Sequence, residues 1–555
     1  MAVKKNWLAP LVLGILAVFI WFFYWKFLVP SYLTFSDAAK FADIARNYVS
    51  GKGFGSSFSP WSLGAVETKG IFPVSWGSPL QPALLSIAFK VLGVKDWVVI
   101  LTSGFFYLLG AMALYYLGKR IFSTLVGVLA SLAFIFDPAM LNYATSGASE
   151  SLFIFEIILA ALLFYCAATS FAYLNSKVSQ FLGSLVLLLM YFTRPSAIIY
   201  IAGFIFLFVL LHFKKKIQIL RVSAVAVAVW LVIEIVLMKF SGKFFLYSPL
   251  ARFISGTTSF SSSAASTVSL RGGGNALVIG LKPLLSKLFY NLYNFYKLLP
   301  QILSPYLAGF YFLSLFLWEK EREKRIFRLI VLFLVVATFF VSAAFLPIYR
   351  YLHPVIPFIY LLAVEMIVWT VNKVVSGYQF VVRKKSLTIN HQSLVIIISF
   401  LLLFVFVVGQ TTGKIFLDSR YLRAHTNPNK PPVYVKLAQI LRENTDSSEL
   451  IITNLDTWGS WYGERKTIWF PLEPSQLIPP EGKKLGIDAI YLTSYKMDDE
   501  NYFMGKEWRE IFYQPEKLED LFFAKNFKFA ERFEIKPEDT YEKEGASAVL
   551  LLKKE

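Results

Sequence analysis

The sequence predicts a multispanning α-helical membrane protein of about eleven transmembrane helices, followed by an α/β domain outside the membrane. Of its 555 residues, 56% are hydrophobic and only 16% are charged, which is too apolar for a soluble chain of this length. Apolar runs long enough to cross a bilayer recur throughout residues 1–411. Beyond residue 411 the composition changes to that of a soluble domain.

The spans follow from the apolar runs. The first, residues 7–30, belongs to "MAVKKNWLAPLVLGILAVFIWFFYWKFLV", which is too long and aromatic for a signal peptide and has no clear cleavage site. Later spans are predicted at 97–117, 123–141, 151–172, 179–193, 196–212, 222–240, 302–318, 326–346, 354–372 and 393–411. The two short segments on either side of "TRPS" can also form one re-entrant pair, which leaves the orientation unchanged.

Basic residues predict the orientation. The formal net charge is +19, and the excess positive charge lies in short loops of the membrane half. With the N-terminus in the cytoplasm, the cytoplasmic loops contain "MAVKK", "GKR", "NSK", "HFKKK", "EKEREKR" and "NKVVSGYQFVVRKK", as the positive-inside rule requires. An odd number of spans then places the C-terminal domain outside a plasma or inner membrane. The basic residues form no continuous stripe, which argues against nucleic-acid binding.

Three outward loops are expected to carry function. Loop 31–96 begins with "SDAAKFADIARNYVSGKGF", whose apolar and polar residues fall on opposite faces of a helix. This predicts an amphipathic helix at the membrane interface, with Asp43 on the face toward water. Residues 79–93 predict a second interfacial helix. The second loop places Glu150 at the mouth of a span, and the third, 241–300, is polar and serine-rich and could act as a lid.

Residues 412–555 predict a small extracytoplasmic α/β domain, separate from the membrane domain of residues 1–411. "PPVYVKLAQILREN" has helical spacing. "ELIITNL", "TIWFP", "DAIYLTS" and "SAVLLLKK" are short strand-like runs bounded by turn residues. The aromatic residues of "DTWGSWYGERK" are expected in the core of this domain.

The charged residues of the membrane half are concentrated on the outer side. Ionisable groups at membrane depth or at its edge are costly, so they usually have a partner or a task. Carboxylates suit proton abstraction, and guanidinium groups suit phosphate. The residues concerned are Asp37, Asp43, Glu67, Asp137 and Glu150, with Arg194 in "TRPS" and Arg350 in "IYRYLHP". The two arginines oppose the positive-inside preference, which makes them the more informative cations.

At this point the chain resembles a known family. An aspartate after the first span opens a helix ending near "GKGF", and "SPLQPALLSIAFKVLG", "YATSGASESLF", "TRPSAI", "RYLHPVIPFIYLL" and "NLDTWGSWYGERKTIWFP" follow in order. Together they look like the C-fold (GT-C) glycosyltransferases of the protein O-mannosyltransferase and lipid A aminoarabinose transferase type. The resemblance runs from about residue 7 to residue 550 and rests on the order of these motifs rather than on any one of them.

The resemblance implies transfer of a hexosyl or pentosyl group from a polyprenyl-phosphate carrier to an acceptor hydroxyl on a protein, lipid or glycan. It implies that Asp37 is the catalytic carboxylate, Glu150 a second catalytic acid, and Arg350 with Tyr351 neighbours of the lipid phosphate. Some relatives use a paired acid, which adds Asp43 to the substrate-binding candidates. Where relatives often carry a basic residue before the helix proline, this chain has Ser78. Lys69 or Arg271 could replace that basic residue.

The residues support the same chemistry independently. A sugar phosphate ester has a good leaving group once the phosphate charge is countered, which Arg350 and Arg194 could do. The acceptor hydroxyl needs a carboxylate to take its proton, and direct displacement would invert the anomeric centre. "RGGGNAL" is not a P-loop, because no Lys-Ser/Thr pair follows, and the absence of a nucleotide motif fits a lipid-linked donor. We expect no cofactor; a divalent cation is possible, but the scattered histidines support no zinc site.

Other interpretations remain open. Asp37 can simply complement the helix dipole, Glu150 can pair with Arg194, and Arg350 can extend to the interface. At the level of the whole chain, a lipid or solute transporter or a non-enzymatic envelope scaffold would also suit many spans. A transporter should bind its substrate at the bilayer midplane and show duplicated halves, whereas these charges gather at one face.

Overall fold

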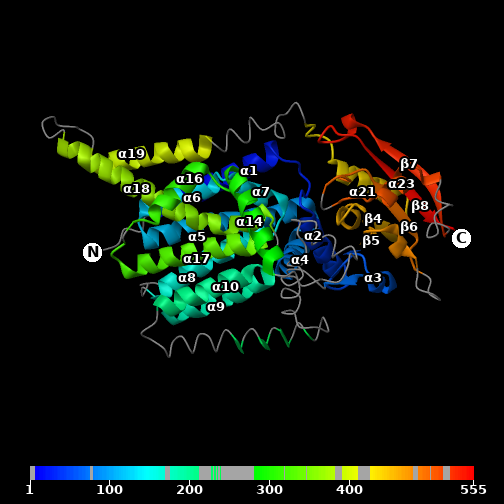
Figure 1. Ribbon diagram of the computed structural model, residues 1–555, viewed down its shortest axis with the longest axis horizontal. Coiled ribbons are helices and arrows are strands. Elements are labelled where there is room, and N and C mark those ends of the chain that lie inside the picture. The colour runs from blue at the N-terminus through cyan, green and yellow to red at the C-terminus, as the bar shows by residue number, and fades with distance from the viewer. Residues whose placement is uncertain are drawn as a thin grey trace.

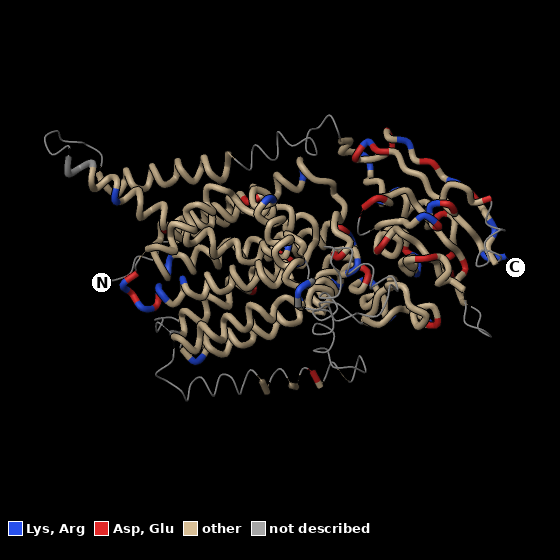
Figure 2. The backbone as a smooth tube through the Cα atoms, in the orientation of Figure 1, with Lys and Arg blue, Asp and Glu red and all other residues tan. Residues whose placement is uncertain are grey.

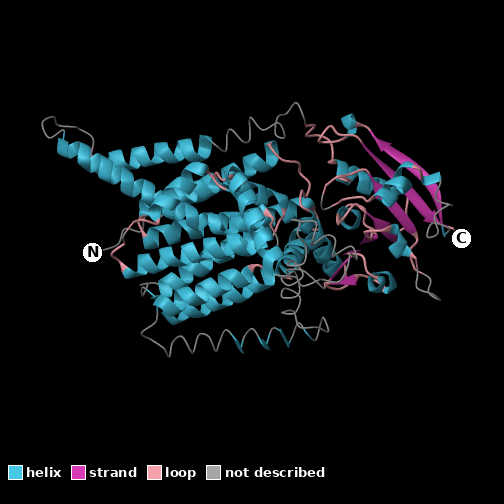
Figure 3. Cartoon of the chain, in the orientation of Figure 1, coloured by secondary structure: helices cyan, strands magenta, loops and turns pink. Residues whose placement is uncertain are grey.

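The computed structural model describes residues 7–74, 79–168, 176–211, 281–317, 319–344, 347–381, 390–409, 426–478, 485–499, 502–516 and 526–554, with a few residues between 227 and 238. Figure 1 shows a bundle of long helices that continues, at one end, into a smaller domain built on a sheet. Helices α2 and α4 lie where the two parts meet (Figure 1). The strands are confined to the C-terminal domain and its border with the bundle (Figure 3).

The bundle is formed by apolar helices of membrane-spanning length. Within the described residues, seven helices are long and apolar enough to cross a membrane, or up to eight if one bent pair counts as a span. They include α1 (Leu8–Phe27), α5 (Asp96–Ile121), α8 (Glu150–Ala168), α9 (Ser176–Thr193), α17 (Arg322–Ala344), α18 (Ile356–Val381) and α19 (His391–Leu403). A shorter apolar helix, α10 (Ala197–Leu211), packs beside α8, α9 and α17. The protein is therefore a multi-pass membrane protein.

The bent pair corresponds to the predicted span 123–141. Its two helices, α6 (Thr124–Ile135) and α7 (Pro138–Ser146), meet at 60°. Asp137 caps the second helix, because its Oδ1 accepts hydrogen bonds from the backbone N–H groups of Ala139 (2.8 Å) and Met140 (3.0 Å). Pro138 occupies the first helical position, where its missing N–H costs nothing. The sequence thus stops one helix and starts another inside what looked like one apolar run.

The predicted number of eleven spans is not confirmed. Helix α15 (Leu299–Ile302) ends where predicted span 302–318 begins, and α16 (Pro305–Ser314), which lies within that span, has only 10 residues. Most of predicted span 222–240 and most of loop 241–300 lie outside the described residues. Of that loop, α14 (Leu281–Lys297) is described, and it packs against α17. Two carboxylates that the sequence places within spans do bridge helices: Glu365 pairs with Arg328 at 2.5 Å, and Glu234 accepts a hydrogen bond from Tyr191 at 3.0 Å.

Lysines and arginines gather at the end of the bundle far from the sheet domain, whereas the C-terminal domain carries both signs of charge (Figure 2). From this distribution the positive-inside rule predicts that the basic end of the bundle is cytoplasmic and that the end bearing the sheet domain is on the outer side. The predicted side of the membrane stays a prediction, as does placement in a plasma or inner membrane.

The C-terminal domain contains a six-stranded sheet in the order β2-β5-β4-β6-β8-β7. Strands β4 (Leu450–Thr453), β5 (Lys466–Trp469), β6 (Ala489–Thr493) and β8 (Ala546–Lys553) are the four that the sequence predicts, and α21 (Val433–Glu443) is the predicted helix. Strand β7 (Phe527–Ile535) was not predicted; most of its residues are exposed, so it lacks the apolar pattern of the others. Helix α23 (Lys506–Tyr513) packs its Trp508 and Phe512 into the core of this domain.

One edge strand of this sheet comes from the first outer loop. Strand β2 (Phe58–Ser59) pairs in parallel with β5, with Phe58 opposite Thr467. Strands β1 (Gly55–Ser56) and β3 (Phe72–Pro73) form a separate two-stranded ladder, and α3 (Leu63–Glu67) lies between them in the chain. The C-terminal domain thus includes part of residues 31–96. The predicted boundary at residue 411 lies in 410–425, outside the described residues.

The two helices predicted in the first outer loop correspond to α2 (Ser36–Val49) and α4 (Leu80–Leu92), close to their predicted bounds. The prediction that α2 turns a polar face to water is wrong. Asp43 is 0% exposed, and Lys40 and Asn47 are buried as well. Helix α2 packs between α4 and α22 (Trp458–Trp461), so the C-terminal domain covers the side that was expected to face solvent.

The aromatic residues of "DTWGSWYGERK" pack in the core of the C-terminal domain and also connect that domain to the helix bundle. Trp458 stacks on Tyr434 of α21 with ring centroids 4.3 Å apart. Trp461 Nε1 and the Tyr462 hydroxyl instead donate hydrogen bonds to the two carboxylate oxygens of Asp96, at 2.8 and 2.7 Å. Because Asp96 begins α5, these bonds attach the sheet domain to the helix bundle.

Candidate active site

Four charged side chains from distant parts of the sequence meet beside the first turn of α2. Arg350 Nη2 lies 2.9 Å from Asp37 Oδ2, and Arg350 Nη1 lies 3.7 Å from Glu150 Oε1. Arg194 Nη1 lies 2.5 Å from the same Glu150 oxygen. The result is one continuous series of alternating charges, Asp37–Arg350–Glu150–Arg194, which we call the charge relay row. The convergence of Asp37 and Arg350 that the sequence-based mechanism needs is present.

The two carboxylates of the row lie in the first turns of helices. Asp37 is the second residue of α2, and the preceding Phe35 is extended without a side-chain cap. Glu150 is the first residue of α8. The unpaired backbone N–H groups of a helix N-terminus favour negative charge, so both positions suit an acidic side chain.

Gly147 explains how α8 can begin so soon after α7 ends. It adopts φ +79°, a left-handed conformation that terminates α7 and that other residues adopt with strain. A Cβ atom there would lie 2.8 Å from Val99 Cγ1 and 3.1 Å from Ala38 Cβ. Glycine therefore allows the α7–α8 turn to approach α2, which brings Glu150 next to the Asp37–Arg350 pair.

The two arginines share an aromatic neighbour. Arg350 belongs to a 3₁₀ segment, η1 (Tyr349–Val355), that leads into α18, and Arg194 follows directly after α9. The guanidinium carbons of Arg194 and Arg350 lie 5.2 and 5.6 Å from the ring centroid of Tyr351. A ring face of this kind attracts cations and holds both guanidinium groups on one side of the site.

Exposure is greatest at the Asp37 end of the charge relay row and small at Glu150 and Arg194. The Asp37 side chain is 41% exposed and that of Arg350 22%, whereas Arg194 is 9% and Glu150 1% exposed. Asp37 is thus the end open to solvent and to a substrate. The partial burial of Asp37 alone would raise its pKa, but the positive charges of Arg350, Arg194 and Lys40 outweigh this effect and hold the pKa below its usual value. Asp37 is consequently a carboxylate at neutral pH, in the state that can accept a proton.

Sequence reasoning missed a buried pair beside the row. The hydroxyl of Tyr143 in α7 is hydrogen-bonded to Nδ1 of His353 in η1, and the Tyr143 ring also packs near that of Phe35. "YATSGASESLF" and "RYLHPVIPF" contain both residues, but nothing in either segment shows that they touch. The pair connects the element that carries Arg350 to the one that precedes Glu150.

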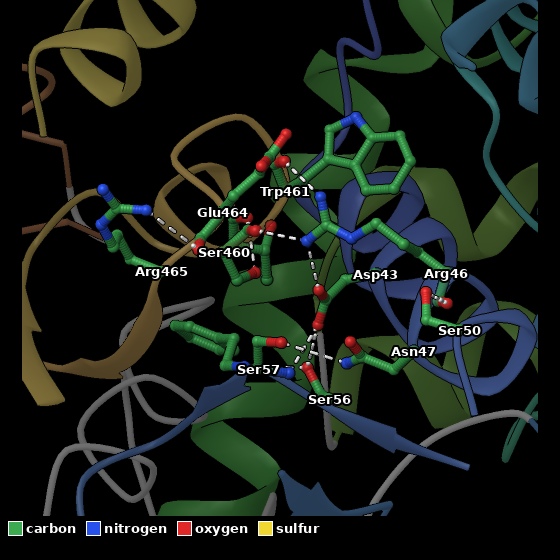
Figure 4. Close-up of polar contacts among 12 residues, drawn as sticks. Asp43, Arg46, Asn47, Ser50, Ser56, Ser57, Ser460, Trp461, Glu464 and Arg465 are labelled. Atoms are coloured by element: carbon green, nitrogen blue, oxygen red, sulfur yellow. Dashed lines mark hydrogen bonds and ion pairs between the residues drawn. The ribbon is translucent and has the colours of Figure 1, made fainter. Parts of the chain in front are cut away.

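Asp43 lies in a different environment, shown in Figure 4. Its Oδ1 accepts a hydrogen bond from Arg46 at 2.8 Å, and its Oδ2 accepts from Ser56 Oγ and the Ser57 backbone N–H at 3.0 and 2.6 Å. Arg46 in turn donates to the backbone carbonyls of Ser460 and Trp461 at 2.6 and 2.9 Å. These contacts join α2, the loop that leads to β2, and the C-terminal domain.

The other predicted candidates lie elsewhere. Lys69 is exposed in the segment between α3 and β3, next to Thr68, whose carbonyl accepts a hydrogen bond from Lys466 of the sheet at 2.5 Å. Arg271 and Ser78 lie outside the described residues. In the part of the chain that is described, no group of three or more His, Cys, Asp or Glu side chains could hold a metal ion.

Known proteins share both the pattern and the fold. Residues 77–236, less than a third of the chain, match the family described as dolichyl-phosphate-mannose-protein mannosyltransferase. The Archaeoglobus fulgidus oligosaccharyltransferase AglB, in complex with an inhibitory peptide and a dolichol-phosphate, aligns with 98% of this chain and 74% of its own at TM-score 0.54 and 13% identity. The Cupriavidus metallidurans ArnT bound to undecaprenyl phosphate aligns with 91% of this chain and 97% of its own, at TM-score 0.50 and 11% identity. No curated protein matches the chain by sequence.

These findings define the class: the protein has the fold of the C-fold integral membrane glycosyltransferases, as the sequence resemblance predicted. Within that class, the matched segment of the mannosyltransferase family contains Glu150 and Arg194, the buried half of the charge relay row.

Proposed function

We propose that the protein transfers a sugar from a polyprenyl-phosphate-linked donor to an acceptor hydroxyl at the non-cytoplasmic face of the membrane, with inversion at the anomeric carbon. The observation that carries this proposal is the charge relay row: a half-exposed carboxylate and two arginines meet at the end of the bundle that adjoins the C-terminal domain. The structural relatives solved in complex with dolichol-phosphate and undecaprenyl phosphate support a lipid phosphate as the carrier.

In this mechanism Asp37 is the general base. Its Oδ atoms accept the proton of the acceptor hydroxyl while the hydroxyl oxygen forms a bond to the anomeric carbon. The bond between that carbon and the phosphate oxygen breaks, and its electron pair leaves with the polyprenyl phosphate. One displacement of this kind inverts the anomeric centre and needs no enzyme nucleophile.

Arg350 and Arg194 counter the phosphate charge that grows as the donor bond breaks. Arg350 is the better placed of the two, because it is partly exposed and reaches Asp37 as well as Glu150. When a donor phosphate binds Arg350, the arginine's hold on Asp37 weakens, and the pKa of Asp37 rises toward its ordinary range. Donor binding would thereby make Asp37 a stronger base at the moment when an acceptor needs one.

Glu150 is the buried carboxylate that pairs with both arginines. It is 1% exposed and pairs with each of them, so it is too buried to meet an acceptor in the described arrangement. Its role in the proposal is to fix the two guanidinium groups and balance their charge. The sequence-based role of Glu150 as a second catalytic acid is thus narrowed to positioning the phosphate-binding arginines.

The test uses the purified full-length protein in nanodiscs, supplied with radiolabelled polyprenyl-phosphate mannose, glucose or arabinose and with peptide, lipid and glycan acceptors. We expect transfer from at least one donor, and loss of transfer in Asp37→Asn. Undiminished transfer by Asp37→Asn would disprove the base assignment. A protein that binds these lipids but moves them across a liposome membrane without transferring the sugar would instead be a transporter.

A further inference from the structure

The carboxylate of Asp456 lies at the border between the C-terminal domain and the active site. It lies between strand β4 and α22, two residues before the helix begins, and its backbone has φ +55°, which only a few non-glycine residues adopt. Its side chain is buried, at 7% exposed. A buried acid in an unfavourable backbone conformation is held in place by its surroundings, and such residues are enriched at functional sites.

The surroundings of Asp456 connect it to the first turn of α2. Its Oδ1 accepts a hydrogen bond from the Thr457 N–H at 2.8 Å, and its Oδ2 accepts one from the Tyr502 hydroxyl at 3.0 Å. The Ser36 side chain lies beside this carboxylate. Thr457 Oγ1 donates to the backbone carbonyl of Ser36 at 2.7 Å. Thr457 therefore holds the backbone of Ser36, and the Asp456 carboxylate holds Thr457 in turn and lies beside the Ser36 side chain.

Ser36 is the residue immediately before Asp37. Because the N-terminal boundary of α2 has no side-chain cap of its own, these contacts supply what fixes the first turn of the helix. We propose that Asp456 and Thr457 are positioning residues for the reaction: by anchoring Ser36 they hold Asp37 where it meets Arg350 and the acceptor hydroxyl. This inference rests on the proposed role of Asp37 as the base.

A displacement of Asp37 by a fraction of an ångström would change proton transfer without changing how the donor is held, because donor binding depends on the two arginines. The C-terminal domain would thus contribute to the catalytic rate without touching the reacting atoms. Burial, and to a smaller extent the negative charge of Asp37, raise the pKa of Asp456. The other titratable groups facing Asp456 are Tyr502 and Tyr495, while Arg350, Arg194 and Lys40 face Asp37.

The test compares Asp456→Gly, Asp456→Asn and Thr457→Val in the full-length protein. Glycine keeps the left-handed backbone but removes the anchor for Ser36, whereas asparagine tolerates that backbone and keeps an acceptor oxygen but loses the charge. The matched control is Asp488→Asn, because Asp488 accepts a hydrogen bond from the Leu450 N–H at 2.9 Å within the same sheet and has no contact to α2 among the described residues.

The assay uses whichever labelled polyprenyl-phosphate sugar supports transfer by the unmodified protein. We expect kcat to fall about 10-fold in Asp456→Gly and Thr457→Val and less in Asp456→Asn, with the donor KM within 2-fold and no parallel loss of thermal stability.

Unchanged kcat in Asp456→Gly and Thr457→Val would overturn the inference. A loss of kcat no larger than that of Asp488→Asn would also overturn it, and so would a loss fully explained by a smaller amount of folded protein. The failure of the proposed function gives a different result. If Asp37→Asn retains full transfer, the base assignment itself is wrong; if Asp37→Asn is inactive while Asp456→Gly is not impaired, only the positioning role is wrong.

Discussion

Helix α2 carries two aspartates, Asp37 and Asp43, in two different environments. Asp37 is 41% exposed and has one arginine partner, which leaves a carboxylate oxygen accessible. Asp43 is 0% exposed, and its oxygens accept three hydrogen bonds from Arg46, Ser56 and Ser57. The difference teaches that sequence position alone does not assign a role: one acid faces a site, while the other fastens the helix between two domains.

The sharpest test of this difference replaces each aspartate by asparagine. We expect Asp37→Asn to lower kcat by about 10²–10⁴-fold, the usual contribution of a general base, while leaving thermal unfolding unchanged. Asp43→Asn should lower stability with a much smaller effect on kcat per folded molecule. Transfer assays and thermal unfolding in detergent, carried out on the same preparations, would separate the two outcomes; equal losses of kcat at constant stability would remove the distinction.

A second variant tests the partner of the exposed aspartate. Arg350→Gln removes the main positive charge that lowers the pKa of Asp37, so the pKa of Asp37 should rise. Since the base must be deprotonated, the acid limb of kcat/KM should move to higher pH, and kcat at neutral pH should fall about 100-fold through lost phosphate stabilisation. A pH–rate profile measures both. An acid limb that stays in place would show that Asp37 is not the group titrating.

The partner of the buried aspartate gives an effect on stability. Arg46→Ala leaves Asp43 buried without its cation and removes two bonds to the Ser460 and Trp461 carbonyls. We expect a loss of about 2–3 kcal/mol in the free energy of unfolding, below the usual range for a buried pair because the Arg46 side chain is 19% exposed. Denaturant unfolding would measure it. The donor KM should stay within 2-fold, and a large rise in KM would place Arg46 in the substrate site instead.

The smallest effect is expected at Lys69. This residue is exposed between α3 and β3, on the side of the first outer loop that adjoins the sheet. Lys69→Ala should therefore change kcat/KM less than 2-fold. A loss of 10-fold or more in kcat/KM would instead show that Lys69 replaces the basic residue that relatives often carry at the position of Ser78.

The sequence predicted the fold class and many of the candidate site residues because apolar runs and short motifs can be recognised within single segments of the chain. Long apolar runs reveal spans, and the four core strands of the C-terminal sheet are apolar enough to recognise. The interruption at Asp137–Pro138 was missed because a capped restart inside an apolar run leaves mean hydropathy unchanged. Strand β7 was missed because an exposed edge strand need not be apolar.

The arrangement around α2 could not be deduced in the same way. An amphipathic pattern states that a helix has two kinds of neighbours, but it does not state whether the polar neighbour is water or protein. The polar face of α2 meets backbone carbonyls of α22, more than four hundred residues later in the chain. The same reason hid Asp456 and the Tyr143–His353 pair: their importance lies in tertiary contacts that no local spacing records.

Strand β2 has a consequence for biosynthesis. Phe58 emerges from the ribosome early, yet its parallel partner Thr467 is made only after the membrane bundle. An edge strand cannot find its place in the sheet before the rest of that sheet exists, so the first outer loop must wait unpaired through most of translation. The first outer loop therefore gains its contacts with the C-terminal domain last, and a nascent or truncated chain without that domain would carry Asp37 on a helix that lacks its contacts to Thr457 and α22.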